Sequence, residues 1–167
     1  MDIGLLVLRL AVGLTMAAHG GQKLFGWFGG YGLAGTGGFM ESLGFRPGRV
    51  HAALAGTAET VGGLLLALGL LTPVGSALVI AVMVVAIGSV HLPKGFFVSD
   101  GGSEYNLVIM AAVAALAFTG PGAYSLDAVE GLELAGWLPG VVAVVAGLVF
   151  GGGALAARRP APVARQS

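Results

Sequence analysis

Residues 52–90 read AALAGTAETVGGLLLALGLLTPVGSALVIAVMVVAIGSV, two long apolar segments joined by little more than Thr72-Pro73. Each segment is long enough to cross a hydrocarbon core of ~30 Å as an α-helix. Proline ends the first helix because its ring fixes φ and it has no amide hydrogen, and so short a connection forces the two helices into an antiparallel hairpin. The hairpin predicts an all-α transmembrane fold.

The composition of the whole chain agrees with this prediction. The 167 residues are 56% hydrophobic and 10% charged, whereas a soluble domain carries about 25% charged residues. The same reasoning predicts further helices on both sides of the hairpin, in a single polytopic bundle. We place helices over residues 3–19, 52–71, 74–90, 104–118 and 138–157. The fourth of these is short, so it would span the membrane only if the bilayer is thinned or if polar residues flank the helix.

Charge and cysteine counts exclude several functions. The eight Lys and Arg residues balance the eight Asp and Glu residues, which argues against a nucleic-acid partner held by phosphate neutralisation. The chain has no cysteine, so by itself it cannot perform thiol chemistry, hold an iron–sulfur cluster or attach a c-type haem. Redox chemistry would therefore require a borrowed cofactor.

The basic residues indicate an orientation. With five spans, the connections that carry Lys23, Arg46, Arg49 and Lys94 lie on the same side as the tail with Arg158, Arg159 and Arg165. The connection between 118 and 138 has Asp127, Glu130 and Glu133 but no basic residue. Because positively charged loops resist translocation, we expect the amino end outside and the carboxyl end in the cytoplasm.

The first connection, residues 20–51, is rich in aromatic residues and suits the membrane interface. We expect Thr36 to cap a short helix there, with Phe39, Met40 and Leu43 facing lipid. The glycines of residues 29–38 indicate a flexible turn, because no Gly-Lys-Ser or Gly-Lys-Thr follows them as in a phosphate-binding loop.

Arg9 and Glu59 lie well inside apolar helices. Each alone would cost roughly 2.5–3.5 kcal/mol at a helix centre, so each needs a partner. Counted from His19 and His51, the predicted helix ends, the two charges have similar depths. We therefore predict a buried Arg9–Glu59 pair; whether it is structural or belongs to a substrate or proton path stays open at this point.

Polar residues gather at the basic end of the predicted bundle. His51 and Asp100 belong to this vestibule, and the candidate ligand-binding residues in it are His19, Lys23, His91, Glu104, Tyr105 and Asn106. His19, His91 and Glu104 could in principle hold a metal, and two histidines a haem, but neither has a spacing signature here. A quinone fits better, since it needs an apolar slot and His, Lys or Tyr donors for its carbonyl oxygens.

The last predicted helix contains Gly147 and Gly151, a G-x-x-x-G pair. Such a pair permits close helix approach, so it could serve homo-oligomerisation or docking on the other helices. In a chain with 31 glycines, chance is a third explanation.

The ordered motifs of the chain resemble the DoxX family of small membrane proteins. The motifs are Arg9, His19-Gly20 with Lys23-Leu24, Glu59 with Gly62-Gly63, Leu68-Gly69-Leu70 before Thr72-Pro73, His91, Gly120-Pro121-Gly122 and Ser125-Leu126-Asp127. The resemblance implies a four-helix membrane unit over residues 1–127 in a bacterial inner membrane, with relatives linked to thiosulfate:quinone oxidoreductase and to complexes that handle thiol or oxidative stress. This chain departs from that pattern by adding a loop and fifth helix over 128–157 and a basic tail over 158–167, which we expect to be disordered.

Our leading functional hypothesis is a membrane subunit of a quinone-linked oxidoreductase or thiol and oxidative-stress system, served by a soluble redox enzyme on the cytoplasmic face. A non-enzymatic scaffold that docks a soluble partner is one alternative. A transporter of a small solute or of protons is another, because a buried charge pair below a polar mouth is also how permeation routes begin.

Overall fold

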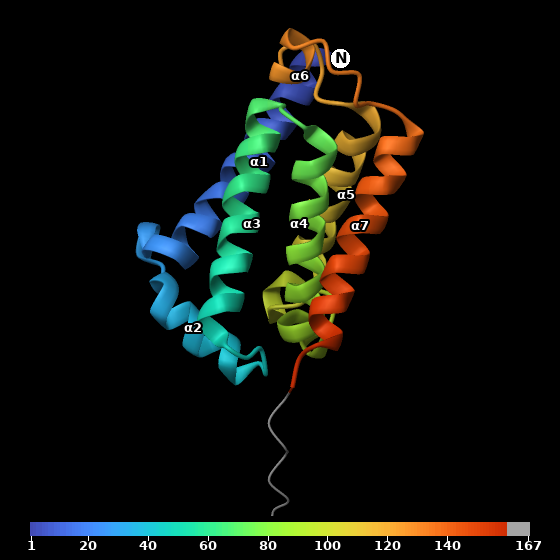
Figure 1. Cartoon of the computed structure of the whole chain (residues 1–167). Coiled ribbons are helices and arrows are strands. Elements are labelled where there is room, and N and C mark those ends of the chain that lie inside the picture. The colour runs from blue at the N-terminus through green and yellow to red at the C-terminus, as the bar shows by residue number, and fades with distance from the viewer. Residues whose placement is uncertain (160–167) are drawn as a thin grey trace, which may run out of the picture.

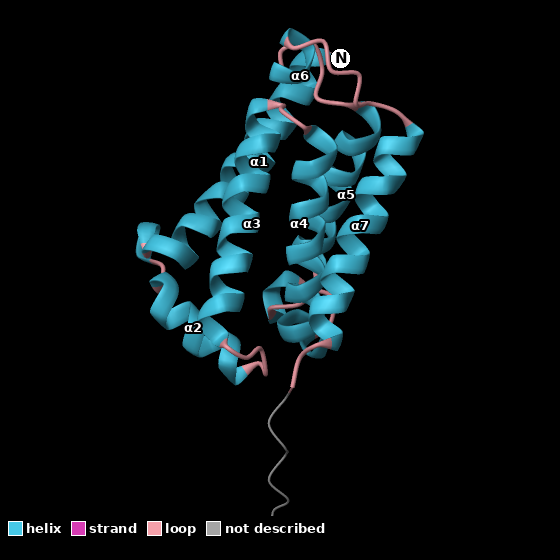
Figure 2. Cartoon of the chain, viewed as in Figure 1, coloured by secondary structure: helices cyan, strands magenta, loops and turns pink. Residues whose placement is uncertain are grey.

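The computed structural model describes residues 1–159, which form a bundle of helices and contain no strand (Figures 1 and 2). The long helices are α1 (Asp2–Phe25), α3 (Gly48–Leu68), α4 (Thr72–Ala86), α5 (Glu104–Thr119) and α7 (Trp137–Ala156). The short helices are α2 (Gly32–Ser42) and α6 (Leu126–Val129). Four segments are long and apolar enough to cross a membrane, namely Asp2–Phe25, Gly48–Leu68, Thr72–Lys94 and Trp137–Ala156. The predicted helical membrane bundle is confirmed.

Helix ends differ from the prediction at two places that matter for the site. Helix α1 continues past His19 to Phe25 and ends at Gly26, whose φ of 74° forms a left-handed cap. Helix α4 passes at Ile87 into a π-helical turn that ends at His91, followed by a 3₁₀ turn to Lys94. The predicted helices over 104–118 and 138–157 match α5 and α7 to within one residue at each end.

Glycines set the distance between α1 and α3, which pack along each other. A Cβ on Gly13 would lie 2.5 Å from the carbonyl oxygen of Gly63, and one on Gly20 would lie 2.5 Å from that of Gly56. No side chain fits at such distances, so these glycines allow the two backbones to touch. Gly20, at which we expected the first connection to begin, thus lies inside α1 and packs against α3.

Helix α2 is not the lipid-facing helix that we predicted. It begins at Gly32, so Thr36 lies within it and does not cap it. Thr36, Gly37 and Met40 form its buried face, and Met40 packs with Phe45 and Ala52 in a small core cluster. The prediction was wrong because it placed Met40 on the lipid-facing side of the helix. Of the three residues expected to face lipid, only Phe39 is exposed, at 51%.

The glycine pair of α7 faces α4. A Cβ on Gly147 would lie 2.6 Å from the Cβ of Ile80, and one on Gly151 would lie 2.7 Å from the Cβ of Val84. Packing of α7 against α4 therefore explains the G-x-x-x-G pattern. The pattern then gives no support to homo-oligomerisation.

The bundle has two groups of helices that part toward one end. In Figure 1, α1, α2 and α3 lie on one side and α4, α5 and α7 on the other, and α3 diverges from α4 away from the turn that joins them. A core that includes Met16, Leu66, Val79 and Leu116 holds the groups together. The amino end lies beside α6, whereas α7 finishes at the opposite end of the bundle. The predicted disordered tail, from Pro160 onward, lies outside the described residues.

Candidate functional site

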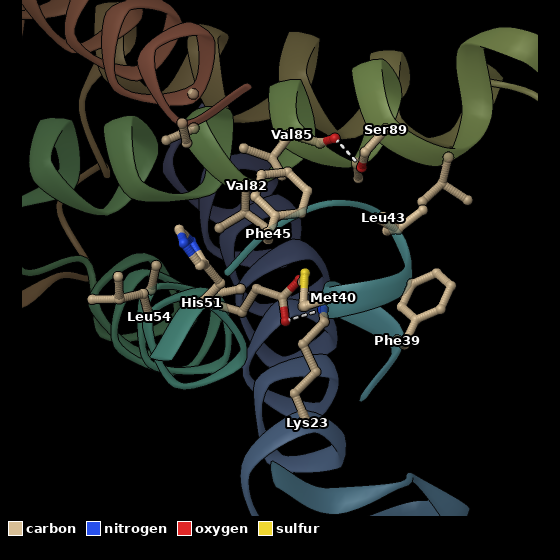
Figure 3. Close-up of a pocket in the computed structure, with 18 of the residues that line it drawn as sticks. Lys23, Phe39, Met40, Leu43, Phe45, His51, Leu54, Val82, Val85 and Ser89 are labelled. Carbon is tan, nitrogen blue, oxygen red and sulfur yellow. Dashed lines mark hydrogen bonds and ion pairs between the residues drawn. The ribbon is translucent and has the colours of Figure 1, made fainter. Parts of the chain in front are cut away.

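The partner of Glu59 is Lys23. The ammonium group of Lys23, in the last turn of α1, bonds to both carboxylate oxygens of Glu59, in the middle of α3 (Figure 3). The side chain of Glu59 is only 3% exposed and that of Lys23 is 26% exposed. This is the one ion pair in the described part of the chain, residues 1–159. It satisfies the need for a partner that a carboxylate inside an apolar bundle creates.

The predicted Arg9–Glu59 pair is wrong. Arg9 is 3% exposed, and its Nη1 atom donates a hydrogen bond of 2.6 Å to the carbonyl oxygen of Ala67. Ala67 lies eight residues beyond Glu59 in α3, roughly 12 Å along the helix axis at 1.5 Å per residue. The prediction measured depth from His19, but because α1 continues to Phe25, Lys23 lies opposite Glu59 and Arg9 lies near the other end of α3.

Asp127 and Arg9 both lie beside Gly69, since a Cβ on Gly69 would lie 2.8 Å from Nη1 of Arg9. The carboxylate of Asp127, 1% exposed, accepts hydrogen bonds from the amides of Leu71 (2.7 Å) and Thr72 (3.2 Å) and from the hydroxyl of Thr72 (2.9 Å). Its own amide donates to the carbonyl oxygen of Gly69 at 2.8 Å. Asp127 thus caps the start of α4. We call Arg9, Asp127, Thr72 and Gly69 the latch, because they tie the α5–α7 connection to the α3–α4 turn.

The latch was missed from the sequence. Its signal was present in Ser125-Leu126-Asp127, where Ser125 caps α6 by accepting a hydrogen bond from the amide of Ala128. Nothing local, however, indicates that Asp127 meets residues more than fifty positions earlier.

An apolar cavity of about 500 Å³ lies between α2, α3, α4 and α7. Its walls are mostly aliphatic and aromatic, as the close-up in Figure 3 shows for Leu54, Val82, Val85 and Phe45. The polar side chains that border the cavity are the Lys23–Glu59 pair, His51, Ser89 and His91. We call it the apolar cavity.

Two further cavities reach the same ion pair. The vestibule cavity, about 270 Å³, lies between α1, α4 and α5 and is bordered by His19, Lys23, Glu59, His91, Tyr105 and Asn106, among others. The interface cavity, about 580 Å³, lies between the end of α1 and α2 and is bordered by His19, Gln22, Lys23, Tyr31 and Thr36 with several glycines. Lys23 borders all three cavities.

His91 is held in one tautomer by the loop before α5. Its Nδ1 atom lies 2.6 Å from the carbonyl oxygen of Gly101. Since a carbonyl oxygen can only accept, Nδ1 carries the proton, and Nε2 of the neutral ring is left as an acceptor. This assignment follows from the bonding partner, and the partner also fixes the orientation of the ring.

The other predicted site residues are divided between the cavities. His19 is exposed and borders both polar cavities. Tyr105 (46% exposed) and Asn106 (5% exposed) border the vestibule cavity, and the amide of Asn106 contacts the sulfur of Met83 at 3.4 Å. His51 borders the apolar cavity and packs on Phe45 with ring centroids 5.3 Å apart.

Glu104 and Asp100 do not join this group. The Oε2 atom of Glu104 accepts a hydrogen bond of 3.0 Å from the amide of Val98, and Asp100 is exposed in the adjoining turn. Within residues 1–159 no three His, Asp or Glu side chains are close enough to hold a metal ion. The metal set of His19, His91 and Glu104 is therefore not assembled.

Fold and site together define a helical membrane protein with a buried charge pair at the junction of one apolar and two polar cavities. Residues 4–92 match the model of the DoxX family, a little over half of the 167 residues, and the chain belongs to that family. The matched range contains Arg9, Lys23, Glu59 and His91. Asp127, which completes the latch, lies beyond it.

One curated relative is informative. The chain is 29% identical over 126 residues to the "Putative oxidoreductase CatD" of Bacillus subtilis (strain 168), which covers 75% of this chain and 86% of that protein. No solved structure matches the chain.

Proposed function

We propose that this protein is the membrane subunit of a quinone-linked oxidoreductase and that the apolar cavity binds the quinone. The observation that carries the proposal is the composition of that cavity, whose lining is mostly apolar and includes a few polar side chains, among them Lys23, Glu59 and His91. Sites for small ligands commonly have a volume of about 300–1,000 Å³ and a few converging polar groups in an apolar lining. The cavity of about 500 Å³ has room for a quinone ring and the first part of its tail.

The polar groups suit both oxidation states of a quinone. An ammonium group has three donors, and two of those of Lys23 are engaged by Glu59, so the third remains for a quinone carbonyl oxygen. The Nε2 atom of neutral His91 is an acceptor and would take a hydrogen bond from a quinol hydroxyl. The site therefore offers a donor for the oxidised ring and an acceptor for the reduced one.

The electrons in this proposal come from a partner protein. The chain has no cysteine, and a soluble redox enzyme at the basic end would supply them there. The name of the relative CatD as an oxidoreductase supports the same class of function.

The test is retention and binding of quinone by purified protein. In mild detergent, wild-type protein should retain a quinone that solvent extraction and mass spectrometry identify, and in nanodiscs it should bind decylubiquinone saturably. Val82→Trp fills the cavity wall and should abolish both. Val74→Trp, on the same helix but 49% exposed, is the matched control and should abolish neither. The proposal is wrong if wild-type protein neither retains nor binds quinone.

Transport is a second candidate, favoured by the meeting of three cavities at Lys23. A route across the bundle would have to continue past the packed core of Met16, Leu66 and Val79, each at most 1% exposed. Uptake of protons or solute into proteoliposomes, abolished by Lys23→Met, would favour transport over quinone binding.

A further inference from the structure

We propose that the Lys23–Glu59 pair exchanges protons between water in the vestibule cavity and the ligand in the apolar cavity. This inference rests on the proposed quinone function and adds the path by which protons reach the ring. It assigns the pair a role beyond neutralising one buried charge.

The first step of the argument is the position of the pair. Lys23, Glu59 and His91 each border both the apolar cavity and the vestibule cavity. The same side chains that can touch a ligand on one side can thus touch water on the other. A merely structural ion pair would need no access from two cavities.

The second step is the difference between the two linings. The vestibule cavity presents the side chains of His19, Tyr105 and Asn106 and the backbone of Gly101 and Gly102. A buried water requires two to four polar partners, which this cavity supplies. The apolar cavity is lined mostly by side chains such as Leu54 and Val82 that offer water no partner. Of its other polar residues, Ser89 already donates to the carbonyl oxygen of Val85 and His51 packs on Phe45, so we expect water to stop at the pair.

The third step is the proton balance. Two-electron reduction of a quinone by a reduced flavin of the soluble partner turns two carbonyl oxygens into hydroxyls and takes up two protons, one on each oxygen. Lys23 gives a proton to the oxygen that it contacts and regains one from vestibule water, while Glu59 holds the proton in transit. The second oxygen receives its proton from the Nε2 atom of His91 in the doubly protonated form, which keeps its Nδ1 proton bonded to the carbonyl oxygen of Gly101 and regains the Nε2 proton from vestibule water. Oxidation of the reduced flavin releases two electrons and two protons, which equal the two electrons and two protons that the quinone takes up.

Besides the pair, five titratable groups border the three cavities. They are His19 from α1, Tyr31 just before α2, His51 from α3, His91 after α4 and Tyr105 from α5, whereas α7 contributes none. None is an Asp or Glu, so Glu59 is the single carboxylate at this junction among residues 1–159.

The first test is the reach of water, and the natural absence of cysteine makes it clean. Asn106→Cys places a thiol on the vestibule wall, whereas Val113→Cys places one seven residues further along α5, where Val113 is 0% exposed and borders none of the three cavities. A charged methanethiosulfonate should modify Asn106→Cys at least about tenfold faster, because an apolar site that raises a thiol pKa by one unit leaves tenfold less thiolate. Val82→Cys should react with a lipid-soluble maleimide but not with the charged reagent. Equal rates for Asn106→Cys and Val113→Cys would overturn the proposal whether or not quinone binds.

The second test is the proton itself. Infrared difference spectra of the quinone-loaded protein, recorded on electrochemical reduction, should show a carboxyl signal that disappears in Glu59→Gln and persists in Glu104→Gln, a carboxylate outside all three cavities. If Glu59→Gln does not fold, wild-type protein with isotope-labelled glutamate should show the signal shifted. A bound quinone that is reduced without any glutamate signal overturns the proton path and leaves the proposed function standing. A protein that holds no quinone overturns both.

Discussion

Lys23 and Glu59 each make the other tolerable inside the bundle. Glu59 is 2% exposed and both of its oxygens are bound by Lys23. Removing one partner of such a pair leaves an uncompensated charge in a medium that solvates it poorly. The same arrangement that positions the pair for a ligand therefore makes the stability of the bundle depend on the presence of both partners together.

We predict that Lys23→Met lowers the free energy of unfolding by about 3–5 kcal/mol, the usual cost of breaking a buried pair by removing one side. The double variant Lys23→Met/Glu59→Gln should recover most of that loss, because it removes both charges. Unfolding of purified protein in detergent measures both effects. Lys94→Met, at an exposed lysine, is the control, and a Lys23→Met variant as stable as this control would contradict the prediction.

At the scale of elements, the latch connects helices that are distant in sequence. Asp127 caps α4 while its own backbone is bound to the carbonyl oxygen of Gly69. We predict that Asp127→Ala costs about 2 kcal/mol, the upper end of the range for loss of a cap, because Arg9 also loses its acidic neighbour. Glu130→Ala, an exposed acid of the same connection, should be neutral. Thermal unfolding in detergent compares the two, and equal midpoints would show that the latch does not stabilise the bundle.

The contact between α1 and α3 depends on glycine. A Cβ on Gly63 would lie 2.5 Å from backbone atoms of Ala17 and Gly13, so Gly63→Ala must push the helices apart. Overpacking of this kind costs about 1–3 kcal/mol. Gly38→Ala in α2 meets nothing within 4 Å and should stabilise by about 0.5–1 kcal/mol, because alanine favours a helix. A melting temperature that falls in the first variant and rises in the second is the expected result; a rise in both would refute the close contact.

The sequence predicts elements better than it predicts contacts. The helix over 104–118 was nearly correct, and the residues around it, Ser103 before and Gly120-Pro121 after, are ones that favour helix ends. Lys23 was assigned to a loop because Gly20-Gly21 resembles a helix end, yet Gly20 packs against α3 and Gly21 lies under the ring of Trp27. An error of six residues at that end moved the partner of Glu59 from Lys23 to Arg9. Contacts depend on where a helix stops, and a single sequence constrains helix ends least.

The whole molecule combines a closed end and an open end. The latch and the core join the two groups of helices beside the α3–α4 turn. Toward the other end the groups separate (Figure 1). The Lys23–Glu59 pair and the cavities around it lie on that side, and α2 forms part of the wall of the apolar and interface cavities. A ligand with an apolar tail and a polar ring suits this division, because the tail can remain toward lipid while the ring reaches the Lys23–Glu59 pair.

The orientation of the bundle remains a prediction, and it decides from which side the open end receives protons and electrons. Lys94 follows α4 and Arg158 follows α7 at the open end of the bundle, whereas Asp127, Glu130 and Glu133 belong to the α5–α7 connection at the closed end, where Figure 1 shows α6. Because basic loops resist translocation, the open end should face the cytoplasm. Green fluorescent protein fused after the last residue should therefore fluoresce, and alkaline phosphatase fused there should be inactive. Alkaline phosphatase inserted after Gly131, an exposed turn residue, should be active. The reverse pattern would place the Lys23–Glu59 pair within reach of the outer compartment, and a cytoplasmic redox partner could then not serve it.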